Sequence, residues 1–569
     1  MRRPALFLAA ALAFAGSAQA QSQTQPSPIS HVGEVAPVAY YRRMLRADSL
    51  LAAGSAAAAD AYPALLRAYP WDGAAWRRMA RALAAAGRHR EAARAFAEAD
   101  ARGVSPYPHY NAVDAARSFL RAGERDSAFA WLHVALERYR YEWLPTLARD
   151  TAFAPLQGDP RFQALIRPAA PDERNAGWRA DLDYLLGEVR RMNAVYSHAP
   201  LPDSLVAAAG ALRRRIPTLG DAQVAVAMQR LLAMLGQSHN NLFLNVPGAR
   251  VRFGALPLTL YQFPDGVYVI GADSAHAGLV GSRLLKLDDT PADSAMVRLR
   301  ALTTRDNPRN EWVGPGYLAV PAVMHALGVA RSPGELRLTL EDRAGRTFSQ
   351  TLAPAPFDAP RRLQAPRGTP AGAAPLYLSR PDDGNWLTRL PDGTVYVQSN
   401  TVFNGPGESL AQFGVRLRRL LADSAARDVV VDVRRNLGGN TYMYPELLRT
   451  LIAFDTGKDH RLFVIIGRAT YSAATNFITD VDRLTNAVFV GEPSGGAPVQ
   501  TGGDESSTVL PYSGLQAALS AGSWNLSAPR DTRPWITPDL PVVLTAADYF
   551  ANRDPALEAI LEITGSGGG

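Results

Sequence analysis

Ser472 stands at the junction of an apolar run and a helical pattern, in the stretch RLFVIIGRATYSAATNF of residues 461–477. A serine in front of a helix is one of the commonest N-cap residues, and capping needs no chemistry. The same position also suits a nucleophile, because unpaired N–H groups and the positive end of the helix dipole favour negative charge that develops on oxygen. The local sequence therefore leaves two interpretations of Ser472, a helix cap and a catalytic nucleophile.

A nucleophilic serine needs a base, and His239 is the candidate. It follows Ser238 in QSHNNLFL, where a helical pattern stops at Gly236 and a strand pattern begins. Imidazole has an ordinary pKa of about 6.5 and accepts a proton near neutral pH. The chain contains 9 histidines, so its position alone favours His239 as the base only slightly over the other eight.

Several other kinds of chemistry lack the residues that they need. The sequence has no cysteine and no HExxH motif, which excludes disulfides, thiol nucleophiles and cysteine-based zinc sites. We therefore expect neither a metal nor a cofactor. A GxSxG motif, which marks the nucleophile of α/β-hydrolase esterases, is also absent, and Ser494 in GEPSGG does not fit it.

Strand and helix patterns alternate over residues 375–562. The strand patterns TVYVQSN, DVVVDV, LFVIIG and AVFVGEP are almost entirely apolar, and helical patterns separate them. This alternation predicts a mostly parallel sheet that is buried on both faces. Active sites of such sheets lie at the carboxyl ends of the strands. The loops RRNLGGN and ATYS both follow strands, so we expect them to line one crevice.

The same two loops offer backbone donors for a developing oxyanion. The N–H of Ala473, together with the N–H of Gly438 or Gly439, would form an oxyanion hole. Glycine suits this loop because the backbone has to approach the substrate closely.

Residues 1–20 have the features of a signal peptide: two arginines, an apolar core and a small-residue cleavage site at Ala18-Gln19-Ala20. The alternative is a membrane span, but the apolar run is short and a polar spacer, residues 21–35, follows it. We expect an exported protein of a bacterial periplasm or cell exterior, with no stable membrane insertion after cleavage. The net charge is +7, but the basic residues are scattered, so no nucleic-acid partner is expected.

Two helical regions precede the His239 segment. Residues 36–170 are rich in alanine and arginine and contain a weak repeat, in which Trp76 and Tyr110 lie 34 residues apart. This period resembles tetratricopeptide repeats, although a generic helical bundle fits nearly as well. Either version suggests a module for protein partners. Residues 176–245 form a second helical segment that ends in the Ser-His motif.

Residues 250–355 contain short strands and turns around one helical insertion. The run AGLVGSRLLKLDDTP resembles the latter part of a PDZ domain, which binds an extended peptide at a sheet edge. The alternative is an unrelated small β-rich domain. A Pro-rich linker, residues 354–375, precedes the α/β region, and residues 563–569 form a glycine-rich tail that we expect to be disordered.

Six segments together resemble the serine peptidases that include tail-specific, C-terminal-processing proteases and the core of the tricorn protease. In order, these segments are LLAMLGQSHNNL, AGLVGSRLLKLDDTP, VVVDVRRNLGG, GRATYSAATNF, VGEPSGG, and TPDLPV followed by DYFANRDPAL. They cover roughly residues 178–561. The resemblance implies a multi-domain fold, with a helical region and a PDZ-like module joined to a crotonase-like α/β core. It also implies that Ser472 attacks peptide bonds.

The family contains two catalytic branches. In the branch with a Ser-Lys dyad, the lysine would fall in the segment that reads GEPSGG here, which has none; Lys286 and Lys458 lie elsewhere, so the dyad is excluded. The tricorn branch uses a serine, a histidine, a second serine directly before that histidine, and a glutamate. Ser472, His239 and Ser238 match the first three.

The acid departs from the family pattern. The corresponding stretch, PRDTRPWITPD, offers Asp531 and no glutamate, so Asp531 is the candidate and Glu492 the reserve. A surface or turn role is the alternative for both. The sequence thus predicts an exported serine endopeptidase or C-terminal processing peptidase that acts on unfolded or tagged polypeptides. The alternative is a catalytically silent scaffold that binds peptides through its PDZ-like and helical-repeat modules.

Overall fold

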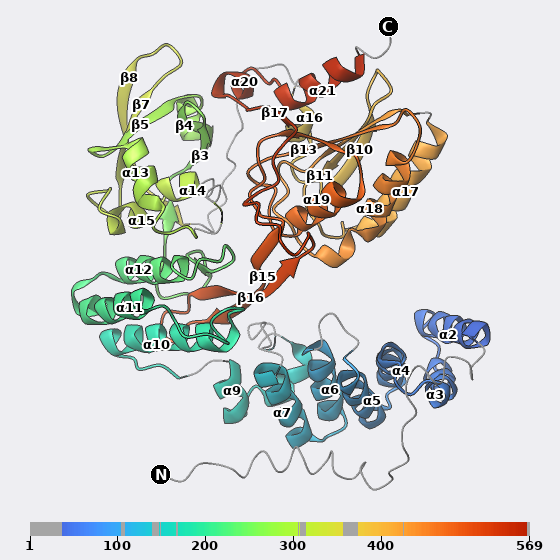
Figure 1. The fold of residues 1–569 in the computed structure, drawn as a ribbon. Coiled ribbons are helices and arrows are strands. Elements are labelled where there is room, and N and C mark those ends of the chain that lie inside the picture. Colours follow the sequence, from blue (N-terminus) through green and yellow to red (C-terminus); the bar gives the residue numbers. More distant parts are fainter. Residues whose placement is uncertain are drawn as a thin grey trace. The chain divides into compact units, whose positions relative to one another are not determined.

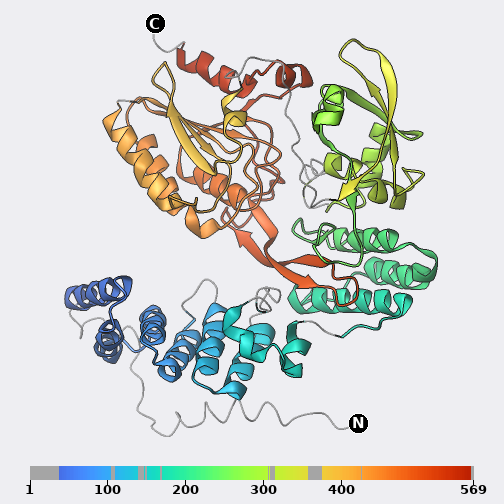
Figure 2. The ribbon, with the colours of Figure 1, turned by 180° about the vertical axis from the view of Figure 1, so that it is seen from behind.

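The computed structural model describes residues 37–103, 109–138, 147, 150–166, 169–304, 307, 314–356, 374–424 and 426–565 (Figures 1 and 2). The chain divides into two compact units, Met1–Tyr141 with Leu147–Phe162, and Glu142–Thr146 with Gln163–Gly569. The predicted signal peptide and spacer, most of the predicted linker and the end of the glycine-rich tail lie outside the described residues. Among the described residues, no helix combines the length and apolar character needed to cross a bilayer.

The first unit is helical, and helices that follow one another in sequence pack side by side. Small buried side chains, among them Ala75, Ala92 and Ala115, allow this close approach. The elements are α2 (Pro37–Ala52), α3 (Ala58–Ala68), α4 (Gly73–Ala85), α5 (His89–Ala101), α6 (His109–Arg121), α7 (Arg125–His133), η3 (Val134–Arg138), η4 (Thr151–Leu156) and α9 (Pro160–Ile166).

Polar contacts in this unit recur at a spacing near 34 residues. Arg90 pairs with Glu124 and Arg125 with Asp159, each 34 residues further along the chain. Arg77 likewise bonds to Asn111, also 34 residues away. The contacts follow the period that separates Trp76 from Tyr110. A classification as tetratricopeptide repeats stays a prediction.

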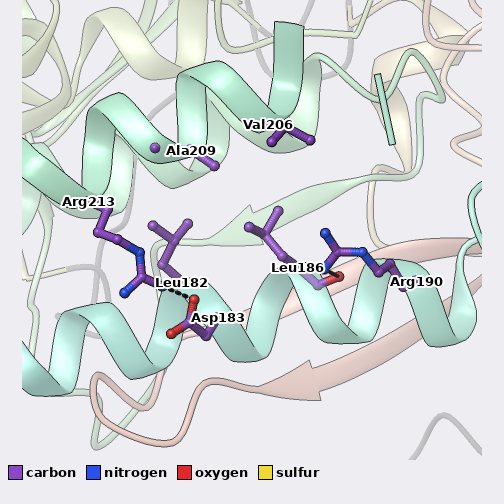
Figure 3. Close-up of a pocket in the computed structure, with 8 residues that line it drawn as sticks. Leu182, Asp183, Leu186, Arg190, Val206, Ala209 and Arg213 are labelled. Carbon is purple, nitrogen blue, oxygen red and sulfur yellow. Dashed lines mark hydrogen bonds and ion pairs between the residues drawn. The ribbon is translucent and has the colours of Figure 1, made fainter. Parts of the chain in front are cut away.

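The second unit begins with three helices, α10 (Arg174–Met192), α11 (Asp203–Arg215) and α12 (Asp221–Ala233). Leu182 and Leu186 of α10 face Val206 and Ala209 of α11 across a cavity of about 230 Å³ (Figure 3). Asp183 and Arg213 form an ion pair at its edge.

A three-stranded antiparallel sheet connects these helices with a distant part of the chain. Its strands are β1 (Asn241–Phe243), β16 (Gln516–Asn525) and β15 (Val499–Val509), in that order across the sheet. The buried carboxylate of Asp181 on α10 accepts the backbone N–H groups of Tyr512 and Ser513, at 2.7 and 2.9 Å. The segment around residue 240 is therefore fixed to the hairpin formed by β15 and β16.

A β-rich region with short helices follows β1 in the chain. Its main sheet has the order β3-β4-β5-β7-β8, with β6 paired to β5. The elements are β2 (Gly254–Ala255), β3 (Leu258–Phe263), β4 (Gly266–Ala272), η6 (Ser274–Leu279), β5 (Arg283–Leu287), β6 (Thr290–Pro291), α13 (Ala292–Leu299), α14 (Gly314–Leu318), α15 (Pro321–Ala326), β7 (Leu336–Glu341), β8 (Thr347–Leu352) and β9 (Ala355–Pro356).

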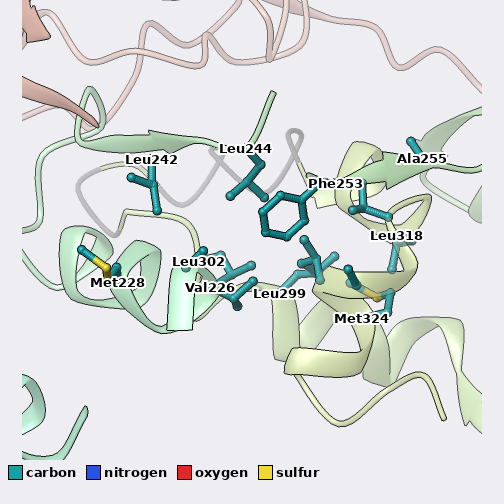
Figure 4. Close-up of a cluster of buried hydrophobic side chains, with 14 of the residues drawn as sticks. Val226, Met228, Leu242, Leu244, Phe253, Ala255, Leu299, Leu302, Leu318 and Met324 are labelled. Carbon is teal, nitrogen blue, oxygen red and sulfur yellow. The ribbon is translucent and has the colours of Figure 1, made fainter. Parts of the chain in front are cut away.

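This region shares a hydrophobic core with the helical segment before it. Val226 and Met228 of α12 join the same buried cluster as Leu299, Leu318 and other side chains of the β-rich region (Figure 4). Leu242 and Leu244, which follow the His239 loop, belong to this cluster as well. One continuous core thus supports the loop that carries the predicted base.

The α/β region contains a six-stranded sheet in the order β10-β11-β12-β13-β14-β17. In this sheet β11, β12, β13, β14 and β17 run parallel to one another, and β10 is an antiparallel edge. The predicted mostly parallel sheet is confirmed. The elements are α16 (Leu376–Ser379), β10 (Asn385–Arg389), β11 (Val395–Ser399), α17 (Leu410–Asp423), β12 (Asp428–Asp432), η8 (Thr441–Met443), α18 (Pro445–Asp455), β13 (Arg461–Ile466), α19 (Ala473–Leu484), β14 (Val488–Gly491), β17 (Leu540–Pro541), α20 (Ala546–Phe550) and α21 (Pro555–Gly565).

Successive side chains of each central strand point to opposite faces of this sheet. On β12, Val429 and Val431 join the cluster formed with α17, α18 and α19. Val430 joins the cluster on the other face, which includes Leu557 and Ile560 of α21. Because both faces are covered, the strands are apolar throughout, as the sequence showed.

Gly414 lies on α17 at the point where this helix packs closely against α18. A Cβ at this position would lie 2.8 Å from Leu447 N and 2.9 Å from Glu446 C, and backbone atoms cannot move aside as a flexible side chain can. We expect Gly414→Ala to lower stability by about 1–3 kcal/mol through overpacking. Denaturant unfolding monitored by circular dichroism measures this change.

Gly187 on α10 provides the matched control. It is also a helical glycine, but a Cβ there meets nothing within 4 Å. Gly187→Ala should leave stability unchanged or raise it by up to about 1 kcal/mol, since alanine is the better helix former. Equal stability changes in both variants would contradict this account of the packing.

Candidate active site

Ser472 occupies the N-cap position of α19, directly after the loop that follows β13, but its side chain does not cap the helix. Its hydroxyl Oγ lies 3.0 Å from Nε2 of His239. The backbone of Ser472 has φ 54° and ψ −126°, a conformation that costs a non-glycine residue free energy. This unusual backbone accompanies a hydroxyl that faces the imidazole instead of the helix N–H groups.

A network of buried amides holds the His239 loop between α12 and β1. Gln237 Oε1 accepts hydrogen bonds from Asn193 Nδ2 at 2.9 Å and from Asn240 Nδ2 at 2.8 Å. Asn240 Oδ1 in turn accepts the N–H of Ser520 on β16, at 2.9 Å. The residues on either side of His239 are therefore fixed, and the imidazole is fixed with them.

The imidazole of His239 is almost fully buried, with 3% of its surface exposed. Burial lowers the pKa of His239 to about 4, and a hydrogen bond to the backbone of Gly502 opposes this shift only in part. The ordinary value of about 6.5 assumed from the sequence is therefore too high, because the chain removes the imidazole from water. At neutral pH the ring is uncharged and its Nε2 is able to accept a proton from Ser472.

Tyr471 contacts the other side of the imidazole. Its hydroxyl lies 3.0 Å from His239 Nδ1, and the two rings stack with centroids 4.8 Å apart and planes at 22°. Sequence reasoning missed this residue. The only signal was its position directly before Ser472, and tyrosine in a loop has many other roles.

The two predicted acids have other partners. Asp531 binds Arg533 and accepts the hydroxyl of Ser527 at 2.5 Å, and the bonds from Arg533 hold the pKa of Asp531 well below its usual range. Glu492 forms two hydrogen bonds with Arg468, at 2.5 and 2.6 Å. Among the described residues, each carboxylate pairs with an arginine, and neither carboxylate affects the pKa of His239.

Ser238 precedes His239 in the same loop, and the two lysines lie on other segments of the chain. Ser238 is half-buried, and its carbonyl lies 3.5 Å from Asn241 Nδ2. Lys286 lies on β5, where it pairs in register with Pro291 and Thr339, and Lys458 lies in the turn after α18. Over the described ranges, neither lysine hydrogen bonds to Ser472.

The loop after β12, residues 434–440, contains Gly438 and Gly439, and we refer to it as the glycine loop. Asn436 joins this loop to the loop that carries Ser472. Its backbone carbonyl accepts the N–H of Tyr471 at 3.0 Å, and its side chain Oδ1 accepts the N–H of Gly438 at 2.9 Å. A Cβ at Gly438 would lie 2.8 Å from both Ser472 Cβ and Ala473 N, so only glycine fits there without a shift. The two loops therefore face one site, as expected.

The predicted oxyanion donors differ in their availability. The N–H of Gly438 is committed to Asn436. The N–H groups of Gly439 and Ala473, in contrast, make no hydrogen bond with any described residue. Ala473 N–H and Gly439 N–H are thus the two amides of this predicted set that remain available to an oxygen beside Ser472.

Three large apolar side chains are exposed in the loops at this edge of the sheet. Phe403, Leu437 and Tyr442 have exposed fractions of 51%, 54% and 49%. Backbone hydrogen bonds between Val402 and the segment around Gly439 hold the loop of Phe403 beside the glycine loop. We refer to Phe403, Leu437 and Tyr442 as the apolar rim.

No group of three or more histidine, aspartate or glutamate side chains is arranged to hold a metal ion within the described ranges. The chemistry that the geometry allows is proton transfer from Ser472 Oγ to His239 Nε2, followed by attack of the oxygen on an electrophile.

The pKa of His239 can be measured directly. We expect the imidazole signal that disappears in His239→Gln to titrate near pH 4 in NMR spectra of histidine-labelled protein. Because the folded-state pKa lies below the ordinary value, the unfolded chain takes up this proton first, and His239 reduces stability as pH falls from about 6.5 to 4. A midpoint at 6.5 or above would contradict the burial described here.

The fold of this chain resembles that of a protein of known structure, although its sequence matches no family model. No family model and no curated protein matches the sequence. The structure of mature CPAF complexed with lactacystin aligns with a TM-score of 0.51 and 12% identity, over 68% of this chain and 97% of CPAF. A second structure of mature CPAF aligns with a TM-score of 0.50 and 13% identity, over 68% of this chain and 96% of CPAF. The chain shares the fold of mature CPAF over this region.

Proposed function

We propose that this protein is a serine peptidase in which Ser472 is the nucleophile and His239 is the general base. The observation that carries the proposal is the 3.0 Å contact between Ser472 Oγ and His239 Nε2. A serine that served only as a helix cap would direct its oxygen to the N–H groups of α19, and Ser472 makes no such bond. The fold shared with CPAF and the sequence resemblance to processing peptidases also support it.

The first half of the reaction uses the neutral imidazole. His239 Nε2 takes the hydroxyl proton while Ser472 Oγ attacks the carbonyl carbon of the peptide bond. The carbonyl oxygen becomes an oxyanion, and the N–H groups of Ala473 and Gly439 are the proposed donors to it. His239 then gives the proton to the leaving amine, and the acyl group stays on Ser472.

The second half of the reaction reverses these roles with water. His239 Nε2 removes a proton from a water molecule, which attacks the acyl carbon, and the proton returns to Ser472 Oγ as the acid product leaves. A base with a low pKa remains unprotonated over a wide pH range. The same low pKa makes it a weaker proton acceptor, so a modest turnover rate is expected.

The proposed substrate is an extended polypeptide. The apolar rim, formed by Phe403, Leu437 and Tyr442, offers exposed apolar surface beside the glycine loop, where side chains next to a scissile bond would lie. We further propose that the region of residues 250–355 is PDZ-like and presents a peptide end, that residues 375–562 form a crotonase-like core, and that residues 36–170 form tetratricopeptide-like repeats for protein partners. Export through a signal peptide at residues 1–20 is part of the same proposal.

A catalytically silent scaffold is less well supported. The main argument in its favour is the absence of the family glutamate. Gln237 has a structural role here, since it bonds to Asn193 and Asn240. A scaffold would not require the contact between Ser472 and His239.

Two serines at helix starts allow a paired test of the nucleophile. Ser409 is a true N-cap of α17, because its hydroxyl accepts the N–H of Gln412 at 3.2 Å. We expect Ser409→Ala to lower stability by about 1 kcal/mol and to leave casein hydrolysis nearly unchanged. Ser472→Ala should abolish casein hydrolysis and leave the melting temperature almost unchanged, because Ser472 makes no capping bond and alanine keeps the same Cβ.

Stability and casein hydrolysis together distinguish a catalytic Ser472 from a structural one and an enzyme from a scaffold. Loss of stability without loss of hydrolysis in Ser472→Ala would make Ser472 a structural residue. Absence of hydrolysis in the wild-type protein, across several unfolded substrates, would favour the scaffold.

A further inference from the structure

A histidine base needs a partner at the nitrogen that does not face the nucleophile. For Nε2 of His239 to accept the Ser472 proton, the ring proton has to sit on Nδ1, and an acceptor at Nδ1 selects this tautomer. In the described part of the chain, the polar contacts of the His239 ring are with Ser472, with Tyr471, and with the backbone of Gly502, whose hydrogen bond favours the protonated ring. None of these partners is a carboxylate.

We propose that Tyr471 is the positioning residue of His239, in the place where a carboxylate was expected. This inference rests on the proposed function. The Tyr471 hydroxyl lies 3.0 Å from Nδ1, and Ser472 Oγ lies 3.0 Å from Nε2. In the Nδ1–H tautomer the hydroxyl accepts the ring proton, which leaves the Nε2 lone pair facing Ser472 Oγ. The stacked tyrosine ring, with centroids 4.8 Å apart, restricts rotation of the imidazole.

Tyr471 is itself held by the loops of the site. Its backbone N–H donates to the Asn436 carbonyl at 3.0 Å, and its own carbonyl accepts the N–H of Ala474 at 3.1 Å. Because Tyr471 and Ser472 are neighbours in sequence, one short segment carries both the nucleophile and the partner of the base. Any shift of this segment therefore moves both contacts of the imidazole together.

A phenol and a carboxylate have different effects on the base. A carboxylate next to Nδ1 stabilises the imidazolium by its charge and raises the pKa of the histidine. A neutral hydroxyl provides orientation and a dipole but no full charge. The imidazolium that forms during catalysis is then stabilised less, which agrees with the low pKa of the buried His239.

Tyr471→Phe tests the hydroxyl and retains the ring. In this variant we expect the rate of labelling by a fluorophosphonate probe to fall roughly tenfold to a hundredfold, by analogy with the loss of the outer hydrogen-bond partner of a metal-bound histidine. In the labelling reaction Ser472 Oγ forms a bond to phosphorus, fluoride leaves, and His239 takes the proton. The acid limb of the rate against pH should move to lower pH, because the imidazolium loses an acceptor.

Tyr184→Phe is the matched control. Its hydroxyl also makes a hydrogen bond of 3.0 Å, to Thr508 Oγ1, and it contacts neither Ser472 nor His239. This variant should label at the wild-type rate with an unchanged pH profile. Melting temperatures of both variants show whether each remains folded.

A second measurement reports the tautomer without any reaction. Nitrogen-15 NMR of the ring should place the proton of His239 on Nδ1 in the wild-type protein and show a shift toward Nε2–H in Tyr471→Phe. The inference is overturned if the variant keeps both the wild-type labelling profile and the wild-type tautomer. If the wild-type protein is not labelled at all, the proposed function fails, and the positioning role fails with it.

Discussion

The site depends on one hydrogen bond that joins residues 233 positions apart in sequence, between Ser472 Oγ and His239 Nε2. Neither residue can reach the other through local structure. Ser472 is fixed by the parallel sheet and by a positive φ that turns its side chain away from α19. His239 is fixed by the amide network around Gln237 and by the core that α12 shares with the β-rich region. The two supports thus meet at this contact of 3.0 Å and at the neighbouring contact of Tyr471 with the same imidazole.

Buried charged side chains hold the start of the glycine loop in place. Arg434 pairs with Asp432 at 2.8 Å and with Asp554 at 2.7 Å, and all three side chains are almost fully buried. The hydroxyl of Tyr396 also donates to Asp432, at 2.7 Å. A buried pair of this kind contributes little net stability, but loss of one partner leaves an uncompensated charge. The network therefore restricts the start of the loop that leads to Asn436 and the two glycines.

Much of this arrangement could be predicted from the sequence, and the rest depends on tertiary contacts. The sheet was predictable because strands buried on both faces are continuously apolar, and the position of Ser472 follows from it. Asp531 was chosen by its place along the chain, but Arg533, two residues away, occupies its carboxylate. Tyr471 could not be recognised, because its hydroxyl meets a histidine 232 positions away. The low pKa of His239 has the same origin, since only the folded chain removes the ring from water.

The most direct measurement of the central claim is the site of covalent modification. After reaction with a fluorophosphonate, tryptic digestion and mass spectrometry, residues 469–483 should form one peptide that carries the adduct on Ser472, since Arg468 and Arg483 flank it. The same reaction with His239→Ala should yield almost no adduct, because no base is left to take the proton. An adduct on another residue, or equal labelling of Ser472 with and without His239, would contradict the account.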